Sequence, residues 1–198
     1  MTTQPGNARH VDTAGKTRGM MVQPESTHCD KWQAEGNEPM GHDEVRHMII
    51  EQTSRYPMRM QYDPHTRTFS ATEYQDLGHA RGVVSAYGWL EGCGTPPGHH
   101  LDIFLSTDTP ERFELGQPVA VRVIGVFVRN DGDDKLVGVE IDRPERRFEE
   151  LPESERQNLM RMYPRIDPGE GWFSVERAEA VIAAFRQNGR RAAADARQ

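Results

Sequence analysis

Two short stretches of the sequence carry side chains that could bind a metal ion or move a proton. The first is residues 93–106, where a loop rich in Gly and Pro leads to His99, His100 and Asp102. Imidazole and carboxylate groups are common ligands of divalent metal ions, and in an extended chain positions 100 and 102 share one face while position 99 points to the other. The stretch therefore predicts either a metal-binding patch at the mouth of a strand or a solvated turn.

The second stretch is the acidic turn Asn-Asp-Gly-Asp-Asp-Lys that ends at Lys135. Asp131 and Asp133 lie two positions apart, so both carboxylates can face the same way, and the lysine adds a cation beside them. This combination suits a hard metal ion bound together with a phosphate oxygen. The alternative is a solvated hairpin tip. The metal interpretation requires other acidic residues, such as Asp102 and Glu51, to converge on the turn.

The elements that must position these residues are strands first and helices last. Segments rich in β-branched, aromatic and Met residues, divided by turn residues, predict strands. The predicted strands are residues 47–52, 57–63, 66–72, 86–92, 101–106, 118–130 and 135–141. The last two pair naturally as a hairpin, because an Asp-Gly turn tolerates the positive φ that a tight hairpin requires.

Two helices are predicted after the strands. Pro152 in the first turn and Pro164 as a stop predict a helix over residues 151–163, and Ser174 as N-cap with Gly189 as terminator predicts a second one. Strands followed by helices, rather than alternating with them, indicate an α+β domain. We expect a small distorted antiparallel β-barrel of the OB-like kind, with two C-terminal helices packed against it.

The composition indicates how much of the chain belongs to the folded domain. The chain has 198 residues, of which 28% are charged and 35% hydrophobic, and such a polar balance indicates that part of the chain lies outside the core. We interpret residues 1–45 as a disordered N-terminal arm, residues 46–188 as one domain and residues 189–198 as a flexible tail.

The net charge of −7 argues against a nucleic-acid backbone or an anionic membrane as the main partner, since both would repel an acidic surface. The two cysteines, Cys29 and Cys93, form no CxxC pair or disulfide framework, which favours a reducing, cytoplasmic setting. No apolar run approaches the roughly 20 residues that span a bilayer, and the start of the chain lacks the apolar centre of a signal peptide. The sequence therefore predicts a soluble protein that binds neither nucleic acid nor membrane.

The order of these features resembles the soluble inorganic pyrophosphatases of the single-domain, magnesium-dependent class, over residues 49–185. The resemblance consists of many short matches, each weak alone but all in the right order. They are Ile50-Glu51, Tyr87-Gly88-Trp89, Gly98 through Leu105, Ile124-Gly125-Val126, Asp131, Asp133, Lys135, Leu151-Pro152-Glu153 and Gly171-Trp172, followed by the final amphipathic helix.

In that family, diphosphate is hydrolysed to two phosphates on a ring of carboxylates that hold magnesium ions. The resemblance implies metal binding by Glu51, Asp102, Asp131 and Asp133. It implies substrate binding by Arg59, Tyr87 and Lys135, and catalysis by Asp102, Asp131, Lys135 and His99. It also implies diphosphate or a related phosphoanhydride as the ligand, Mg²⁺ as the cofactor and a homo-oligomer as the assembly.

Several positions depart from the family's pattern. Pro97 and His99 replace the first two aspartates of its three-aspartate motif, so that only Asp102 remains. Gln61 stands for a glutamate, and Thr72 stands where a phosphate-binding arginine is expected. His99 could act as a replacement base or ligand, and because imidazole favours softer ions, Mn²⁺ or Zn²⁺ could then replace Mg²⁺.

Two hypotheses about function follow. The first is an inorganic diphosphatase-like, metal-dependent hydrolase with an altered or weakened site. The alternative is a catalytically inactive protein of pyrophosphatase fold that acts as a binding module or partner subunit. It is favoured by the replacements and by Ile166 and Asp167, which stand for a tyrosine and a lysine that hold the departing phosphate. A barrel that binds an oligonucleotide is disfavoured by the acidic balance.

Overall fold

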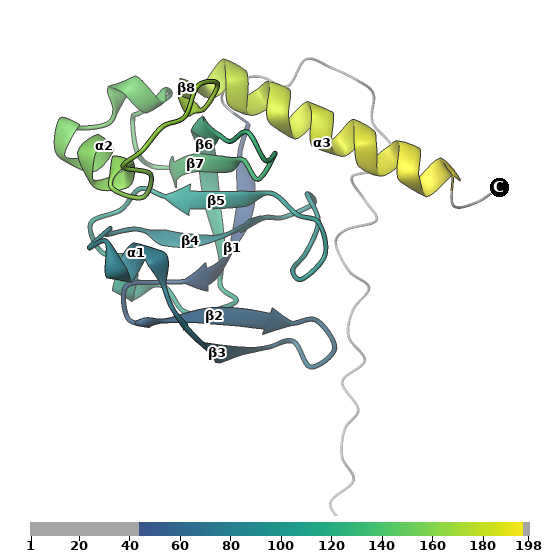
Figure 1. Cartoon of the computed structure of the whole chain (residues 1–198), viewed down its shortest axis with the longest axis horizontal. Helices are drawn as coiled ribbons and strands as arrows, with labels where there is room; N and C mark the ends of the chain where they lie inside the picture. The colour runs from purple at the N-terminus through teal and green to yellow at the C-terminus, as the bar shows by residue number, and fades with distance from the viewer. Residues whose placement is uncertain (1–43, 196–198) are drawn as a thin grey trace, which may run out of the picture. The chain divides into compact units, whose positions relative to one another are not determined.

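A computed structural model describes residues 44–195 and arranges the strands as a closed β-barrel (Figure 1). The strands are β1 (Arg46–Gln52), β2 (Met58–Asp63), β3 (Thr68–Gln75), β4 (Ala86–Leu90), β5 (Asp102–Leu105), β6 (Pro118–Val128), β7 (Lys135–Glu140) and β8 (Gly171–Ser174). The helices are α1 (Leu77–Ala80), α2 (Glu153–Met160) and α3 (Val175–Asp195), with the 3-10 turns η2 (Pro110–Arg112) and η3 (Phe148–Glu150). The two predicted C-terminal helices are α2 and α3, whereas β8 and the one-turn helix α1 were not predicted.

The barrel closes because β1 has a partner on each side. The strand order is β1-β4-β5-β7-β6, β6 returns to β1, and β8 extends the sheet beyond β6. This arrangement confirms the OB-like α+β barrel. The strand pairs of the barrel are antiparallel as expected except for one, since β5 and β7 run parallel. The long connection between them contains β6, which leaves enough chain for β7 to return in the direction of β5.

Two apolar clusters hold the domain together, and β6 contributes to both. Val123 and Val126 belong to the interior cluster, whereas Ile124 belongs to the cluster that includes Leu159 of α2. A bulge between Val123 and Gly125 shifts the alternation of β6 by one residue, which explains why positions 123 and 126 face the same side. Fully burying side chains of this size stabilises the fold by roughly 1.5–3 kcal/mol each.

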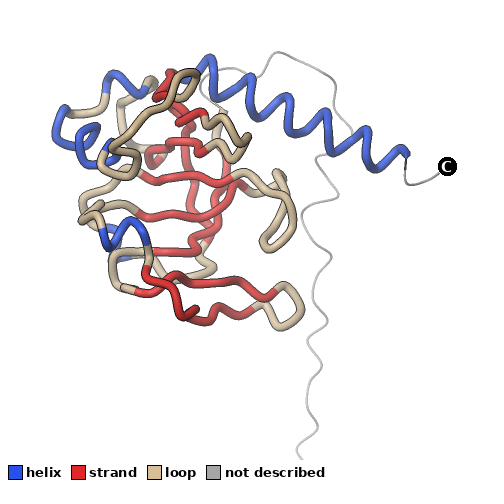
Figure 2. The backbone as a smooth tube through the Cα atoms, in the orientation of Figure 1, coloured by secondary structure: helices blue, strands red, loops and turns tan. Residues whose placement is uncertain are grey.

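The β2–β3 hairpin is a separate sheet beside the barrel (Figure 2). Tyr62 of β2 packs against Trp89 of β4 with ring centroids 5.2 Å apart, and Phe69 of β3 completes this aromatic contact. Gln52 at the end of β1 accepts a hydrogen bond from the backbone N–H of Met60 at 2.8 Å. These contacts fix the hairpin, and with it Arg59, against β1 and β4.

The C-terminal end differs from the prediction. α3 continues through Gly189 to Asp195, so the helix end predicted at Gly189 is wrong and the predicted tail begins inside the helix. Gly189 lacks a positive φ, and the Arg and Ala residues that follow it favour helix. The predicted arm, apart from residues 44–45, lies outside the described residues. Between residues 44 and 195, no helix is both long and apolar enough to cross a membrane.

Candidate functional site

Asp102 and Lys135 lie side by side because two neighbouring strands begin at these residues. The parallel pairing of β5 and β7 sets them opposite each other. Lys135 Nζ donates to Asp102 Oδ2 at 2.5 Å and to Asp133 Oδ1 at 2.7 Å. The side chains of Lys135 and Asp102 are each less than a tenth exposed. Water therefore screens this ion pair only weakly.

The two histidines ahead of β5 point in different directions. His100 Nδ1 donates to the carbonyl of Gly98 at 2.6 Å, and its Nε2 lies 3.0 Å from Asp102 Oδ1. His99 stacks instead on Phe185 of α3, with ring centroids 4.6 Å apart. The alternation expected for an extended chain is thus confirmed, and His99 does not join the carboxylates as the resemblance suggested.

Arg129, directly after β6, holds the aspartates of the acidic turn. Its Nη2 donates to Asp131 Oδ2 at 2.7 Å, and its Nη1 donates to Asp133 Oδ2 at 3.1 Å. The guanidinium also lies over the ring of Tyr163, 5.7 Å from the ring centroid. Since Asp133 contacts both Arg129 and Lys135, a chain of alternating charges runs from the turn to the buried ion pair.

Glu51 and Tyr87 approach Asp102 from β1 and β4. β1 carries a bulge at Glu51, and bulges of this kind re-aim a side chain. Gly88 allows the two strands to come close, because a Cβ there would lie 1.8 Å from the carbonyl oxygen of Ile49. The local backbone therefore sets a carboxyl group and a phenol near the buried aspartate.

Burial and neighbouring charges shift the pKa values of these groups. Burial, together with Asp102, raises the pKa of Glu51 to about 7. Burial alone would raise the pKa of Asp102, but His100 and Lys135 hold it below its usual value. Burial and the nearby aspartate raise the pKa of Tyr87 well above its usual value. Glu51 is therefore partly protonated at neutral pH, whereas Asp102 stays ionised.

Arg59 is exposed on β2 and close enough to Glu51 to lower its pKa, against the larger effect of burial. Thr72 Oγ1 donates to the carbonyl of Arg59 at 3.0 Å, so it braces the hairpin instead of presenting a cation. The remaining departures from the family's pattern are exposed: Gln61, Pro97, Ile166 and Asp167.

We call the residues that the structure brings together the Asp102 cluster. Its members are Glu51, Arg59, Tyr87, His100, Asp102, Arg129, Asp131, Asp133, Lys135 and Tyr163. His100 was predicted as a potential metal ligand from its alternation with Asp102, although the resemblance did not name it. Arg129 and Tyr163 were not predicted as site residues. Adjacency to the acidic turn was a usable signal for Arg129. Nothing in the sequence marks Tyr163.

Solved structures share this architecture. The inorganic pyrophosphatase from Neisseria gonorrhoeae aligns with a TM-score of 0.59 at 21% identity, over 76% of this chain and 94% of that one. The enzyme structure from Ehrlichia chaffeensis gives 0.55 at 20% identity, over 75% and 95% of the two chains. That from Thermus thermophilus gives 0.52 at 21% identity, over 76% and 95%. The chain has the inorganic pyrophosphatase fold.

No family model and no curated protein sequence matches the chain. At the identities found, structural similarity shows the fold alone, and a shared fold does not establish a shared activity. The side chains of the Asp102 cluster therefore bear on function more directly than the fold does.

The carboxylates of the cluster are not arranged as a magnesium site. Within residues 44–195, no group of three or more His, Cys, Asp or Glu side chains could hold a metal ion. Asp102 Oδ1 is buried without a well-aligned hydrogen bond, but His100 Nε2 lies 3.0 Å away, and Lys135 holds Oδ2. Magnesium demands a near-octahedral set of oxygens. The donor set therefore does not fit the ion that the pyrophosphatase resemblance implies.

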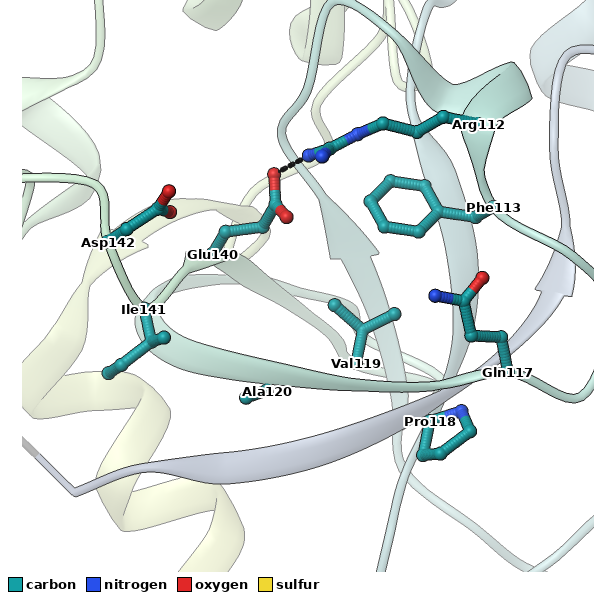
Figure 3. Close-up of a pocket in the computed structure, with 9 residues that line it drawn as sticks. All are labelled: Arg112, Phe113, Gln117, Pro118, Val119, Ala120, Glu140, Ile141 and Asp142. Carbon is teal, nitrogen blue, oxygen red and sulfur yellow. Dashed lines mark hydrogen bonds and ion pairs between the residues drawn. The ribbon is translucent and has the colours of Figure 1, made fainter.

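A pocket of about 420 Å³ lies at the other end of β7 (Figure 3). Arg112 forms an ion pair with Glu140 there and lies over the ring of Phe113, 4.5 Å from its centroid. β7 begins at Lys135 and ends at Glu140, so the length of this strand separates the pocket from the Asp102 cluster. No residue of the cluster lines the pocket.

Proposed function

We propose that the Asp102 cluster binds diphosphate or a related phosphoanhydride, and that the chain does not hydrolyse it at an ordinary enzymatic rate. One observation carries this proposal. One oxygen of Asp102 pairs with the ammonium of Lys135 and the other faces His100, while His99, which stands at the position of a missing aspartate, stacks on Phe185. The cluster thus keeps groups that hold phosphate, while the residue at the place of the missing aspartate is turned away from them.

The basic side chains support a phosphate ligand. Arg59, Arg129 and Lys135 supply N–H donors, and Tyr87 and Tyr163 add hydroxyl groups. Arginine is well suited to this role, because its planar fork can donate to two oxygens of one phosphate group. Each charge-assisted hydrogen bond of this kind contributes about 1.5–3 kcal/mol.

Hydrolysis needs a base placed beside the bound substrate. His99 faces α3, so it cannot take the place of the missing aspartate without leaving Phe185. Asp102 is a weakened base, because His100 and Lys135 hold its pKa below the usual value despite its burial. These features favour binding over turnover.

The test is to measure binding and turnover on the same protein. We expect diphosphate to bind in calorimetry, and phosphate release with Mg²⁺, Mn²⁺ or Zn²⁺ to stay far below about 1 per second. Turnover at or above that rate with any of these ions would contradict the loss of catalysis. A protein that does not bind diphosphate would contradict the proposal as a whole.

Glu51 favours a second candidate, a diphosphatase-like, metal-dependent hydrolase with an altered site that uses Mg²⁺, Mn²⁺ or Zn²⁺. A carboxyl group with a pKa of about 7 suits general acid–base catalysis at neutral pH. In this case Glu51→Gln should abolish phosphate release while diphosphate still binds. Release that persists in the variant would exclude this role for Glu51.

The cytoplasmic setting and the homo-oligomer stay predictions from the sequence and from the resemblance. The assembly can be measured directly by size-exclusion chromatography with light scattering. A monomer across the micromolar range would contradict the predicted homo-oligomer.

A further inference from the structure

We propose that the Asp102 cluster binds its phosphoanhydride with the chain's own basic side chains and without a divalent metal ion. This inference rests on the proposed function and goes beyond it, because the pyrophosphatase resemblance implies a substrate held through magnesium. The ligand class is a compact anion with a phosphate group at each end, and sodium diphosphate is the probe.

Each aspartate of the cluster already has a cation as its partner. Lys135 contacts Asp102 at 2.5 Å and Asp133 at 2.7 Å. Arg129 contacts Asp131 at 2.7 Å and Asp133 at 3.1 Å. An ammonium and a guanidinium therefore supply the positive charge that a divalent ion would bring to these oxygens.

The burial of Lys135 makes this charge hard to exchange for a metal ion. The side chains of Lys135 and Asp102 are only 8% and 9% exposed. A metal ion that took Asp102 would leave the ammonium buried and short of a partner, and an unpaired buried charge is strongly unfavourable. His100 is a second obstacle, because its Nε2 lies 3.0 Å from the other carboxylate oxygen.

Arg129 is the cation that can change partners. Its side chain is 29% exposed, and the two aspartates that it holds are each 55% exposed. Because exposed ion pairs contribute little free energy, a phosphate group with two negative charges can displace Asp131 and Asp133 from Arg129 at small cost. Arg59 adds an exposed cation beside Glu51.

The first experiment titrates the full chain with sodium diphosphate by calorimetry, once in EDTA and once in magnesium chloride. We expect the Kd in EDTA to lie within about threefold of the Kd in magnesium. Binding that appears only with magnesium overturns this inference and leaves the proposed binding function standing. No binding in either buffer overturns the proposed function, and the inference with it.

Asp131→Asn tests the inference by the sign of its effect. The variant can keep the hydrogen bond that Asp131 Oδ1 accepts from the backbone N–H of Asp133 at 3.1 Å, because asparagine has the same acceptor. With one carboxylate fewer on Arg129, diphosphate should bind on the order of fivefold more tightly in EDTA. Metal-mediated binding predicts weaker binding, because a ligand of the ion is lost. An affinity that falls or stays the same overturns the inference.

Arg129→Gln should weaken diphosphate binding in EDTA by about tenfold or more, because a charge-assisted contact is lost. Arg112→Gln is the matched control, since it removes an arginine beside Glu140 at the far end of β7. Circular dichroism during thermal unfolding shows that both variants fold. If Arg129→Gln binds diphosphate as tightly as the control, Arg129 does not hold the ligand and the inference fails.

Discussion

The two halves of the Asp102 cluster contain the same kinds of charge in different surroundings. In the buried half, Lys135 and Asp102 are each less than a tenth exposed. In the exposed half, Arg129 holds Asp131 and Asp133, whose side chains are 55% exposed. Removing one partner of an ion pair lowers the stability strongly where the other partner stays buried. The effect is small where water can solvate the remaining charge. The buried half therefore acts as a fixed support, and the exposed half as the part that can exchange ligands.

Lys135→Met should have the largest effect, because it leaves Asp102 buried without its ammonium. We expect the free energy of unfolding in urea to fall by about 3–5 kcal/mol. The matched control is Lys135→Met combined with Asp102→Leu, which removes both charges and should recover much of the loss. A single variant within about 1 kcal/mol of the wild type would show that the pair is screened as surface pairs are.

Glu51 should give the next largest effect, through the dependence of stability on pH. Its folded-state pKa of about 7 lies above the ordinary value of 4.5, so the folded protein binds the proton more tightly than the unfolded chain. The resulting stabilisation is complete below pH 4.5 and is lost as the pH rises to 7. Between pH 4.5 and 7, the free energy of unfolding of the wild type should fall by roughly 1–3 kcal/mol relative to that of Glu51→Gln. A difference that does not change with pH would contradict the raised pKa.

The pairing of His100 with Asp102 allows a similar test at smaller scale. His100 has a raised pKa, chiefly because it interacts with Asp102, so the stability that it contributes is present below pH 6.5 and is lost as the pH rises through its folded-state pKa. We expect His100→Asn to cost on the order of 1 kcal/mol at pH 5.5 and less at pH 8.5. The control is His100→Asn in an Asp102→Asn background, where the partner carboxylate is absent and the pH trend of the substitution should be smaller. Equal pH trends in the two backgrounds would contradict the pairing of His100 with Asp102.

Much of the fold could be predicted from local patterns. Turn residues and apolar alternation placed the strands from residue 47 to 141 close to their observed bounds, because both signals act within a few residues. The parallel pair β5–β7 and the edge strand β8 could not be found in this way, since strand partners are chosen by contacts distant in sequence. Gly189 was misleading because glycine ends a helix only where the chain adopts a left-handed conformation.

The site was also predicted only in part, because some of its contacts join residues that are distant in sequence. Asp102 and Lys135 could be named from their types and neighbours, but their contact depends on the pairing of β5 with β7. The resemblance favoured His99, whereas simple strand alternation placed His100 on the side of Asp102, and the structure follows the alternation. Arg129 contacts Asp131 and Asp133 because it lies directly beside the acidic turn, and no sequence motif includes it.

Arg129→Gln should have the smallest effect on stability, even though it is expected to weaken ligand binding. Its ion pairs with Asp131 and Asp133 are open to water, so the free energy of unfolding should fall by less than about 1 kcal/mol. Raising the salt concentration should reduce this difference further, because screening acts on exposed pairs first. Urea unfolding at low and high salt measures both effects beside Lys135→Met, for which salt should matter little. If Arg129→Gln destabilised the protein as much as Lys135→Met, the exposed half would be a structural support as well, and a phosphate ligand could not replace the aspartates at small cost.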